Sequence, residues 1–448
     1  MKRGFTRHIG PPRMVLLGFL AVILLGTLLL MLPFAAKTGE STPFLNALFT
    51  STSATCVTGL VVYDTFSHWT GFGQAVILLL IQIGGMGVVT IAVALSIISG
   101  KKISLRQRWI MQESISAPHV GGILRQTSFI LKTSFCIEAL GALALSFRFV
   151  PMFGFGRGLW YAVFHSVSAF CNAGFDLMGV NEPFSSMTAF TGDPLVVITL
   201  SLLIISGGIG FLTWGDIRDK GLRFKRYSAQ TRMVLVLSAV LLVGGFACYA
   251  GELLHNPGIA APGGESFLAA LFQSVTTRTA GFNTVPLDAL GSGSQLVTVM
   301  LMLVGGATGS TAGGFKVNTL AVLLLTMISA FRGKANAEGF GRRLSAATIR
   351  NAVAIFLLYM LLFVGGGLLI RLADGIPLMG AMFEAASAVA TVGLSLGYTP
   401  GLSAVSHVLL ICLMYFGRVG GLTLMYAVVE QDHLGSAVRL PEETVAVG

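Results

Sequence analysis

Long apolar stretches alternate with shorter polar segments along the whole chain. Eight stretches are apolar enough to form helices that cross a bilayer, at about residues 13–35, 72–98, 128–150, 194–215, 231–254, 294–330, 348–373 and 404–430. A spanning helix needs roughly 20 mostly apolar residues, so the pattern predicts eight spans. The first stretch is longer than the apolar part of a signal peptide and has no A-x-A-like cleavage site, which favours a retained span.

The composition excludes an ordinary soluble chain. Hydrophobic residues make up 54% of the sequence and charged residues 11%, outside the usual range of soluble domains. We therefore expect an all-α, polytopic membrane protein. The sequence has no cluster of acids, histidines or paired nucleophiles at one membrane face, so we do not expect an enzyme.

Basic residues give the chain a net charge of +10, from 29 Lys and Arg against 19 Asp and Glu. Many lie in the amino-terminal tail or near three inter-span segments: Lys2, Arg3, Arg7, Arg13; Lys101, Lys102, Arg106, Arg108; Arg218, Lys220, Arg223, Lys225, Arg226; Arg332, Lys334, Arg342, Arg343. The positive-inside rule places these segments and both termini in the cytoplasm. We expect them to meet anionic membrane lipids, not nucleic acid, and a cytoplasmic protein could use the same surface.

Five cysteines occur without metal-binding or disulfide spacing: Cys56, Cys136, Cys171, Cys248 and Cys412. They form no C-x-x-C pair and no cluster with histidine, so we expect neither a zinc site nor a disulfide framework. We interpret them as small buried apolar residues.

A shorter apolar run ending in glycine occurs four times between paired spans. The runs are "FTSTSATCVTGL" from Phe49, "FHSVSAFCNAGF" from Phe164, "FQSVTTRTAGF" from Phe272 and "FEAASAVATVGL" from Phe383. Their glycines, Gly59, Gly174, Gly281 and Gly393, are 115, 107 and 112 residues apart. This spacing predicts four tandem units, residues 1–100, 101–220, 221–335 and 336–448, each with two spans and a short helix between them.

Each run is too short to cross a membrane. Eleven helical residues rise roughly 16 Å, about half of a hydrocarbon core near 30 Å, so we expect re-entrant pore helices. Irregular backbone at that depth must be buried in protein or face water. Glycine permits a positive φ or a close approach, which can turn carbonyl oxygens toward a shared axis.

Four such loops predict one central ion pore with pseudo-fourfold symmetry. A ring of carbonyl oxygens can replace the hydration shell of a cation, and the carboxyl ends of the short helices favour a cation at the centre. The candidate ion-binding residues of this selectivity filter are Thr55, Cys56, Val57, Thr58, Gly59, Cys171, Asn172, Ala173, Gly174, Thr279, Ala280, Gly281, Ala390, Thr391, Val392 and Gly393.

Glycine clusters accompany the second span of each unit: 84–87, 207–210, 305–306 and 420–421. We expect close helix packing there, which is compatible with a position beside the pore.

Together these motifs resemble the Trk/Ktr/HKT superfamily of potassium transporters over essentially the whole chain. The segments that carry the resemblance are "TCVTGL", "CNAGF", "TRTAGF" and "TVGLS". The chain is most similar to the membrane subunits of bacterial Ktr systems, because it starts at the first unit without two extra helices and ends in "LPEETVAVG".

The resemblance implies potassium uptake across the bacterial plasma membrane, with sodium conduction or sodium coupling as the alternative. Plant relatives with serine at the first filter glycine conduct sodium, so Gly59 favours potassium. The resemblance also implies a homodimer on a cytoplasmic ring of nucleotide-binding regulatory subunits (RCK-type, KtrA-like). We find no nucleotide site in this chain, so nucleotide control would belong to that ring.

The sixth span contains an unusual glycine-rich segment, "GGATGSTAGGFK", residues 305–316. Each interior glycine costs about 1 kcal/mol relative to alanine in a helix, so we expect a break. A phosphate-binding loop is excluded because no G-K-[ST] follows, and plain helix packing is the alternative. The segment resembles the family's intramembrane gating loop.

Two basic residues accompany this candidate gate. Lys316 would anchor the loop or reach a carboxylate. Arg418 is costly inside a span and matches the family's arginine in the last span, where it would pair with loop carbonyls; the alternative is a packing arginine that reaches the interface. The candidate gate residues are Gly305, Gly306, Ala307, Thr308, Gly309, Ser310, Thr311, Ala312, Gly313, Gly314, Lys316 and Arg418.

Four more polar residues lie at membrane depth. Arg278 should support the filter from behind through carbonyls or an acid, with Glu252 and Asp288 as candidates. Glu384 is interpreted as an acid at a helix start, and His165 as a packing histidine. Glu138 is a functional candidate by its depth, or faces a buried hydroxyl or basic group.

Overall fold

The computed structural model describes residues 10–88, 90–91, 123–256, 258–260 and 263–421. Four long helices dominate it: α1 (Pro11–Leu30), α7 (Ile123–Phe153), α11 (Ala229–His255) and α15 (Ala346–Asp374). In these described ranges, four helices are long and apolar enough to cross a membrane, or up to five if one bent pair counts as a span. Each long helix is the predicted first span of a unit.

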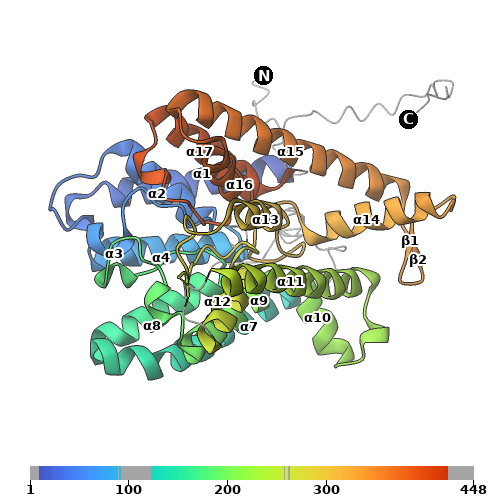
Figure 1. The fold of residues 1–448 in the computed structure, drawn as a ribbon, viewed down its shortest axis with the longest axis horizontal. Helices are drawn as coiled ribbons and strands as arrows, with labels where there is room; N and C mark the ends of the chain where they lie inside the picture. The colour runs from blue at the N-terminus through green and yellow to red at the C-terminus, as the bar shows by residue number, and fades with distance from the viewer. Residues whose placement is uncertain (1–9, 89, 92–122, 257, 261–262, 422–448) are drawn as a thin grey trace, which may run out of the picture.

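A short helix follows each long one: α2 (Phe44–Thr55), α8 (Phe155–Phe170), α12 (Gly264–Thr276) and α16 (Leu378–Val389). Each begins upstream of the phenylalanine that opens its predicted run. Each also ends four or five residues before the predicted glycine, so the glycine lies in a loop. In Figure 1, coloured blue to red in chain order, α7 and α8 lie at the bottom of the view and α15 at the top.

The second helix of each unit is short or broken. These helices are α4 (Gly71–Met86), α9 (Pro194–Gly208) with α10 (Phe211–Lys220), α13 (Ser292–Leu303) with α14 (Val317–Phe331), and α17 (Ala404–Val419). The break predicted in the sixth span is present between α13 and α14, and the second helices of the other units, predicted as continuous spans, also end or bend early. Helix α9 bends by 92° into α10. Gly87, Gly210 and Gly420 follow α4, α9 and α17 with φ of 87°, 86° and 91°, a conformation that glycine adopts without steric cost.

Glycines in these second helices pack against the carboxyl ends of the short helices. A Cβ on Gly84 would collide with the Thr55 carbonyl, and one on Gly207 with that of Phe170. The predicted close packing is confirmed in these two units. In the fourth unit Gly417, not the predicted Gly420 and Gly421, makes the equivalent contact with Val389.

One three-way contact recurs in all four units. A glycine of the long helix faces a leucine of the second helix, and a small residue of the short helix lies close to the same glycine. The sets are Gly26, Leu80, Ser51; Gly141, Leu203, Ser166; Gly245, Leu301, Ser274; and Gly366, Leu413, Ala385. A larger residue at the glycine would separate the three helices, which explains why small residues recur at this depth.

Minor elements connect the helices. They are α3 (Thr65–His68), the 3-10 turns Pro33–Ala35, Met178–Val180, Thr188–Phe190, Phe224–Arg226 and Thr399–Gly401, and the strands β1 (Glu338–Gly339) and β2 (Arg342–Arg343). The strands pair antiparallel between the third and fourth units. Within the described ranges, this two-stranded ribbon is the one departure from the all-α expectation.

The cysteine prediction is only partly right. Cys56 and Cys171 are buried, whereas Cys136, Cys248 and Cys412 are exposed. The three exposed residues lie on α7, α11 and α17, apolar helices whose outer faces would meet lipid. A thiol behaves as a small hydrophobe, so lipid is as suitable a surrounding as the core.

Several predicted features fall outside the described residues. They are Lys2, Arg3, Arg7, the basic residues Lys101, Lys102, Arg106 and Arg108, the carboxyl-terminal ends of the second and last predicted spans, and the tail 440–448.

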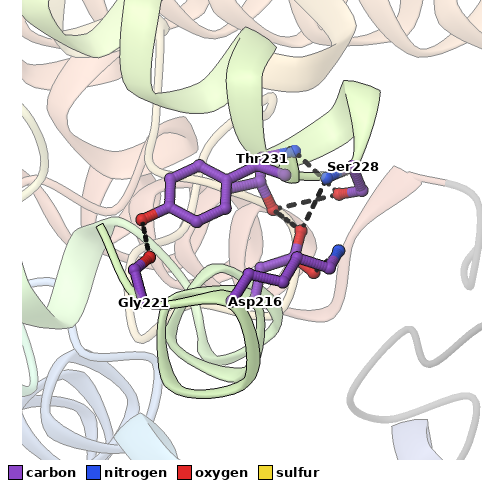
Figure 2. A network of polar contacts seen from close by, with 6 residues as sticks. Asp216, Gly221, Ser228 and Thr231 are labelled. Atoms are coloured by element: carbon purple, nitrogen blue, oxygen red, sulfur yellow. Dashed lines mark hydrogen bonds and ion pairs between the residues drawn. The ribbon is translucent and has the colours of Figure 1, made fainter. Parts of the chain in front are cut away.

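A polar network joins α10 to the start of α11 (Figure 2). The Asp216 carboxylate accepts from Ser228 N at 2.9 Å, from Thr231 Oγ1 at 2.7 Å and from Lys220 Nζ at 2.5 Å. Tyr227 Oη donates to the Gly221 carbonyl at 2.6 Å. These contacts hold the link between the second and third units in one conformation.

Substitution of Asp216 by asparagine should destabilise this link. An amide loses the ion pair with Lys220 and weakens two further bonds, so we expect the free energy of unfolding to fall by about 1–2 kcal/mol. Thermal unfolding in detergent would measure the loss. Asp219→Asn, a neighbouring acid on the same helix, is the control; equal melting temperatures for the two variants would contradict a role for the network.

Candidate functional site

Four loops that contain the predicted glycines carry unusual backbone. These glycine loops are residues 55–59, 171–174, 278–281 and 390–393. Each glycine has positive φ: 95° at Gly59, 69° at Gly174, 85° at Gly281 and 95° at Gly393. Two positions earlier, a residue other than glycine also has positive φ, at Val57, Asn172, Thr279 and Thr391. Such strain in non-glycine residues concentrates at functional sites.

The four glycines face one another in a closed order. A Cβ on Gly59 would meet the carbonyl oxygen of Ala173, and one on Gly174 that of Ala280. In the same way Gly281 faces the Val392 carbonyl, and Gly393 faces the Thr58 carbonyl. Each loop therefore approaches the next with its backbone, and no side chain fits at any of the four glycines.

Equivalent hydrogen bonds connect each loop to its short helix. Thr58 N donates to Ser53 O, Ala173 N to Ser168 O and Val392 N to Ser387 O, each at 2.8 Å; Ala280 N donates to Thr276 O at 2.9 Å. The side-chain hydroxyls of the same four residues also take part. Ser53 and Ser387 accept from Gly59 N and Gly393 N at 3.1 and 3.0 Å, whereas Ser168 and Thr276 donate to Phe175 O and Phe282 O at 2.7 and 2.5 Å.

The sequence analysis missed these hydroxyl residues. A serine or threonine five or six positions before each glycine was the available signal, visible once the four runs are aligned. These hydroxyls stabilise the loop conformation, because without each of them a buried backbone group of the loop would lack a hydrogen-bond partner.

A cavity of about 690 Å³ opens on the glycine loops, and we call it the acidic vestibule. Its lining includes all four glycines and the carboxylates of Asp64, Asp176, Glu182 and Asp288. Among the described residues that line it, none is lysine or arginine. A cavity lined by one sign of charge concentrates the opposite ion, here a cation.

The segment between α13 and α14, residues 304–316, forms a loop that we call the connecting loop. Its ends are paired, with Gly305 N donating to Phe315 O at 2.9 Å. Its middle fills the break between α9 and α10: Ala307 N donates to Gly208 O at 2.9 Å, and Gly309 O accepts from Phe211 N at 2.8 Å. The connecting loop therefore satisfies backbone groups that the bend would leave unpaired.

Arg418 joins three elements beneath the glycine loops. From α17, its guanidinium donates to Thr311 O in the connecting loop, to Gly84 O of α4 at 2.5 Å and to Gly85 O at 3.3 Å. The expected pairing with loop carbonyls is therefore present, and the side chain does not extend to the interface. Lys316 donates to Ala312 O and Gly313 O at 2.5 and 3.4 Å, so it anchors the loop, and it pairs with no carboxylate in the described part of the chain.

The connecting loop lies directly against the glycine loops. Thr311 Oγ1 donates to Phe170 O at 3.1 Å, and a Cβ on Gly313 would collide with the Thr391 side chain. A second cavity, of about 390 Å³, is lined by Ser310, Lys316 and Arg418, and it shares no lining residue with the acidic vestibule. The two sets of loops thus lie between two cavities.

Arg278 has carbonyl partners and no acid among the described residues. Its guanidinium donates to Ser238 O and Gly305 O, both at 3.4 Å. The suggested partner Glu252 instead accepts from Gly291 N and Ser294 Oγ, both at 3.0 Å, and Asp288 lines the vestibule. The prediction that Arg278 binds backbone carbonyls is confirmed, and the suggestion that it pairs with Glu252 or Asp288 is wrong.

Glu384 does not lie at a helix start, so that prediction is wrong. It is fully buried in the middle of α16 and accepts from Ser395 Oγ at 2.6 Å, Thr399 Oγ1 at 2.5 Å and Leu396 N at 3.1 Å. The carboxylate therefore holds the segment that follows Gly393.

The structure also gives the partners of His165 and Glu138. His165 is a packing histidine as predicted: Nδ1 lies 2.7 Å from Tyr161 O, and Nε2 accepts from Leu177 N at 3.2 Å. Glu138 faces the amide of Gln82 and the thiol of Cys171, and its carboxyl group has no hydroxyl or basic partner among the residues that the structure describes.

The described residues thus combine long apolar helices with backbone carbonyls that gather beside a cavity lined by acidic residues. The chain belongs to the TrkH family of cation transport proteins, because that family model matches residues 15–244 and 254–436. It is therefore a multi-pass membrane protein of a transporter family.

Named relatives match the chain along almost its full length. It is 37% identical over 456 residues to the potassium/sodium uptake protein NtpJ of Enterococcus hirae, covering 100% of this chain and 99% of that protein. It is 37% identical over 442 residues to the Ktr system potassium uptake protein B of Bacillus subtilis, covering 98% and 97%.

A solved structure shares the fold. The potassium transporter TrkH of Vibrio parahaemolyticus superimposes with a TM-score of 0.72 at 21% identity, covering 96% of this chain and 87% of that one. At this identity the likeness concerns the fold alone.

Proposed function

We propose that this chain is the membrane subunit of a potassium uptake system and that K⁺ passes between the four glycine loops. The observation that carries the proposal is the closed order in which Gly59, Gly174, Gly281 and Gly393 each face a carbonyl of the next loop. Rings of backbone carbonyls can replace the hydration shell of K⁺. The four units would then be repeats around one pore.

The surroundings of the loops favour a cation. Helices α2, α8, α12 and α16 each end at a glycine loop, so the negative ends of their dipoles lie next to the passing ion. The acidic vestibule would raise the local cation concentration at the outer mouth, if the basic segments lie in the cytoplasm.

The connecting loop is the proposed gate. It lies between the glycine loops and the second cavity, and Arg418 and Lys316 both donate to its carbonyls. An ion that leaves the glycine loops would meet this loop and the Arg418 charge. Opening would require the loop to withdraw, which its glycines permit because they restrict the backbone little.

The Ktr relatives also suggest the assembly. The name of the Bacillus subtilis relative places it in a Ktr system. By analogy, this chain would form a homodimer in the plasma membrane on a ring of RCK-type, KtrA-like subunits. The basic segments that include Arg223, Lys225, Arg342 and Arg343 are the proposed docking surface, alongside anionic lipid.

Sodium conduction, or potassium uptake coupled to sodium, is the second candidate. The Enterococcus hirae relative is named for both ions, which is the observation in its favour. Glycine at position 59 favours potassium because a ring without side chains leaves only carbonyl ligands there.

Flux through purified protein tests the proposal. Liposomes containing the chain should accumulate ⁸⁶Rb⁺ along a K⁺ gradient, and external K⁺ should compete at concentrations roughly tenfold or more below those of Na⁺, a difference of about 1.4 kcal/mol. A variant that lacks residues 307–312 should be run in parallel, so that a closed gate is not mistaken for an absent pore. No flux through either protein would refute the proposed pore, and stronger competition by Na⁺ would favour the second candidate.

A further inference from the structure

One acidic residue, Glu138, interrupts an otherwise apolar position of the long helices. In three units, a serine of the short helix donates to the backbone carbonyl of the residue at this position, which identifies the equivalent residues. The bonds are Ser51 Oγ to Ile23 O at 2.7 Å, Ser166 Oγ to Glu138 O at 2.6 Å and Ser274 Oγ to Leu242 O at 2.7 Å. The first and third units carry isoleucine and leucine there. The second unit carries glutamate.

Glu138 is buried against neutral polar groups. Its side chain is 5% exposed, and Gln82 Nε2 donates to both carboxyl oxygens, at 3.0 and 3.1 Å. The Cys171 thiol lies 3.9 Å from one of them. No ion pair to Glu138 occurs within the described ranges. An acid at membrane depth is costly, and an aliphatic residue fits this position in two other units, so packing alone does not account for it.

The position of Glu138 places its carboxyl group behind the second glycine loop. Cys171 is the first residue of that loop. A Cβ added to Gly85 of α4 would lie 2.8 Å from the Cβ of Cys171. Gln82 lies one turn before Gly85 on the same helix, and Arg418 donates to the Gly84 and Gly85 carbonyls. The same turn of α4 therefore contacts the Glu138 carboxyl group through Gln82 and the Arg418 guanidinium through the Gly84 and Gly85 carbonyls.

We propose that Glu138 is a positioning residue that sets the cation affinity of the second glycine loop. The carboxylate, held by Gln82, attracts a cation in that loop when it is ionised and offsets the positive charge of Arg418. The effect acts through space, because Coulomb attraction at an effective dielectric near 20 extends over several ångströms. This inference rests on the proposed function.

A hydrogen-bonding role without charge makes a different prediction. Glutamine at position 138 has nearly the same shape and can still pair with Gln82, so it would preserve a purely structural brace. Exchanging the two residues, as Gln82→Glu with Glu138→Gln, returns one carboxylate and one amide to the same place. The charge hypothesis therefore predicts a loss in the single variant and recovery in the exchanged pair.

The experiment measures K⁺ competition for ⁸⁶Rb⁺ uptake by reconstituted variants. Glu138→Gln should raise the apparent KM for K⁺ roughly tenfold, with the maximal rate within about twofold of the original; a tenfold change corresponds to about 1.4 kcal/mol. The exchanged pair should return the KM to within about threefold. Glu338→Gln, an exposed acid paired with Lys334, is the matched control and should leave the KM unchanged.

Two results would overturn the inference. An unchanged KM in a folded Glu138→Gln protein would remove any role for the charge. A raised KM that the exchanged pair fails to lower would assign the effect to geometry. If Glu138→Gln does not fold, the exchanged pair alone decides: a KM near the original supports the inference, and a tenfold higher KM refutes it. Absence of flux in the unmodified protein would instead refute the proposed function.

Discussion

Replacement of Gly59 by serine should lower the preference for K⁺ over Na⁺ by roughly tenfold or more, the change produced by about 1.4 kcal/mol. Gly59 has a φ of 95°, and a Cβ there would collide with the Ala173 carbonyl. A serine would therefore displace the carbonyl of the neighbouring loop. Its hydroxyl would also add a ligand to a ring that is otherwise all backbone.

The preference is measured as the ratio of K⁺ and Na⁺ concentrations that halve ⁸⁶Rb⁺ uptake. Gly39→Ser is the matched control, because Gly39 also has positive φ, 73°, but an added Cβ would meet nothing within 4 Å. Backbone strain is thus shared by both variants, and only Gly59→Ser disturbs the glycine loops. An unchanged ratio in folded Gly59→Ser protein would remove Gly59 from the proposed filter.

Deletion of residues 307–312 should raise the rate of K⁺ flux roughly tenfold or more, a lowering of the barrier by about 1.4 kcal/mol. The deletion removes the middle of the connecting loop, including Thr311, which bonds both the Phe170 carbonyl and Arg418. Without that segment, little backbone would stand between the glycine loops and the second cavity. The variant also loses the bond from Ala307 N to Gly208 O, so its thermal stability should fall.

A milder variant separates obstruction from damage. Arg418→Gln removes the guanidinium that holds the Thr311 carbonyl, and flux should rise by a smaller factor. Arg371→Gln is the control, because Arg371 donates to the Gly375 and Ile376 carbonyls at the end of α15 and contacts no part of the loop. A deletion variant that folds and conducts less than the original would contradict the gating role.

The repeated features were predictable because they are local. A run of about 11 residues that ends in glycine can be recognised by composition and spacing, and the same is true of the long apolar helices α7, α11 and α15. The break in the sixth span before Lys316 was also predictable from its glycines, since helix propensity depends on the local residues alone.

The breaks after α4, α9 and α17 were not predicted. Gly87, Gly210 and Gly420 each lie within an apolar stretch that the sequence analysis treated as one continuous span, 72–98, 194–215 and 404–430. Hydropathy reports the surroundings of a side chain, whereas a break depends on whether another segment can satisfy the freed backbone groups. For α9 the connecting loop does so, at Gly207, Gly208 and Phe211.

The partners of buried charges were predicted least well. Sequence distance suggested Glu252 or Asp288 for Arg278 and a helix start for Glu384, and neither was right. In the fold, Arg278 reaches carbonyls 27 and 40 residues away, and Glu384 accepts from a segment 11 to 15 residues further on. Hydrogen-bond geometry selects these partners, and proximity in the chain does not.

The sequence by itself determined the membrane environment, the four glycine runs and the family, because hydropathy, spacing and residue identity are one-dimensional properties. Only the tertiary structure decided which carbonyl each glycine faces, how Arg418 joins α17 to Gly84 across 334 positions, and that Glu138 lies behind Cys171. Those contacts depend on how packed helices approach in space, where backbone distance and burial set the energy whatever the separation along the chain.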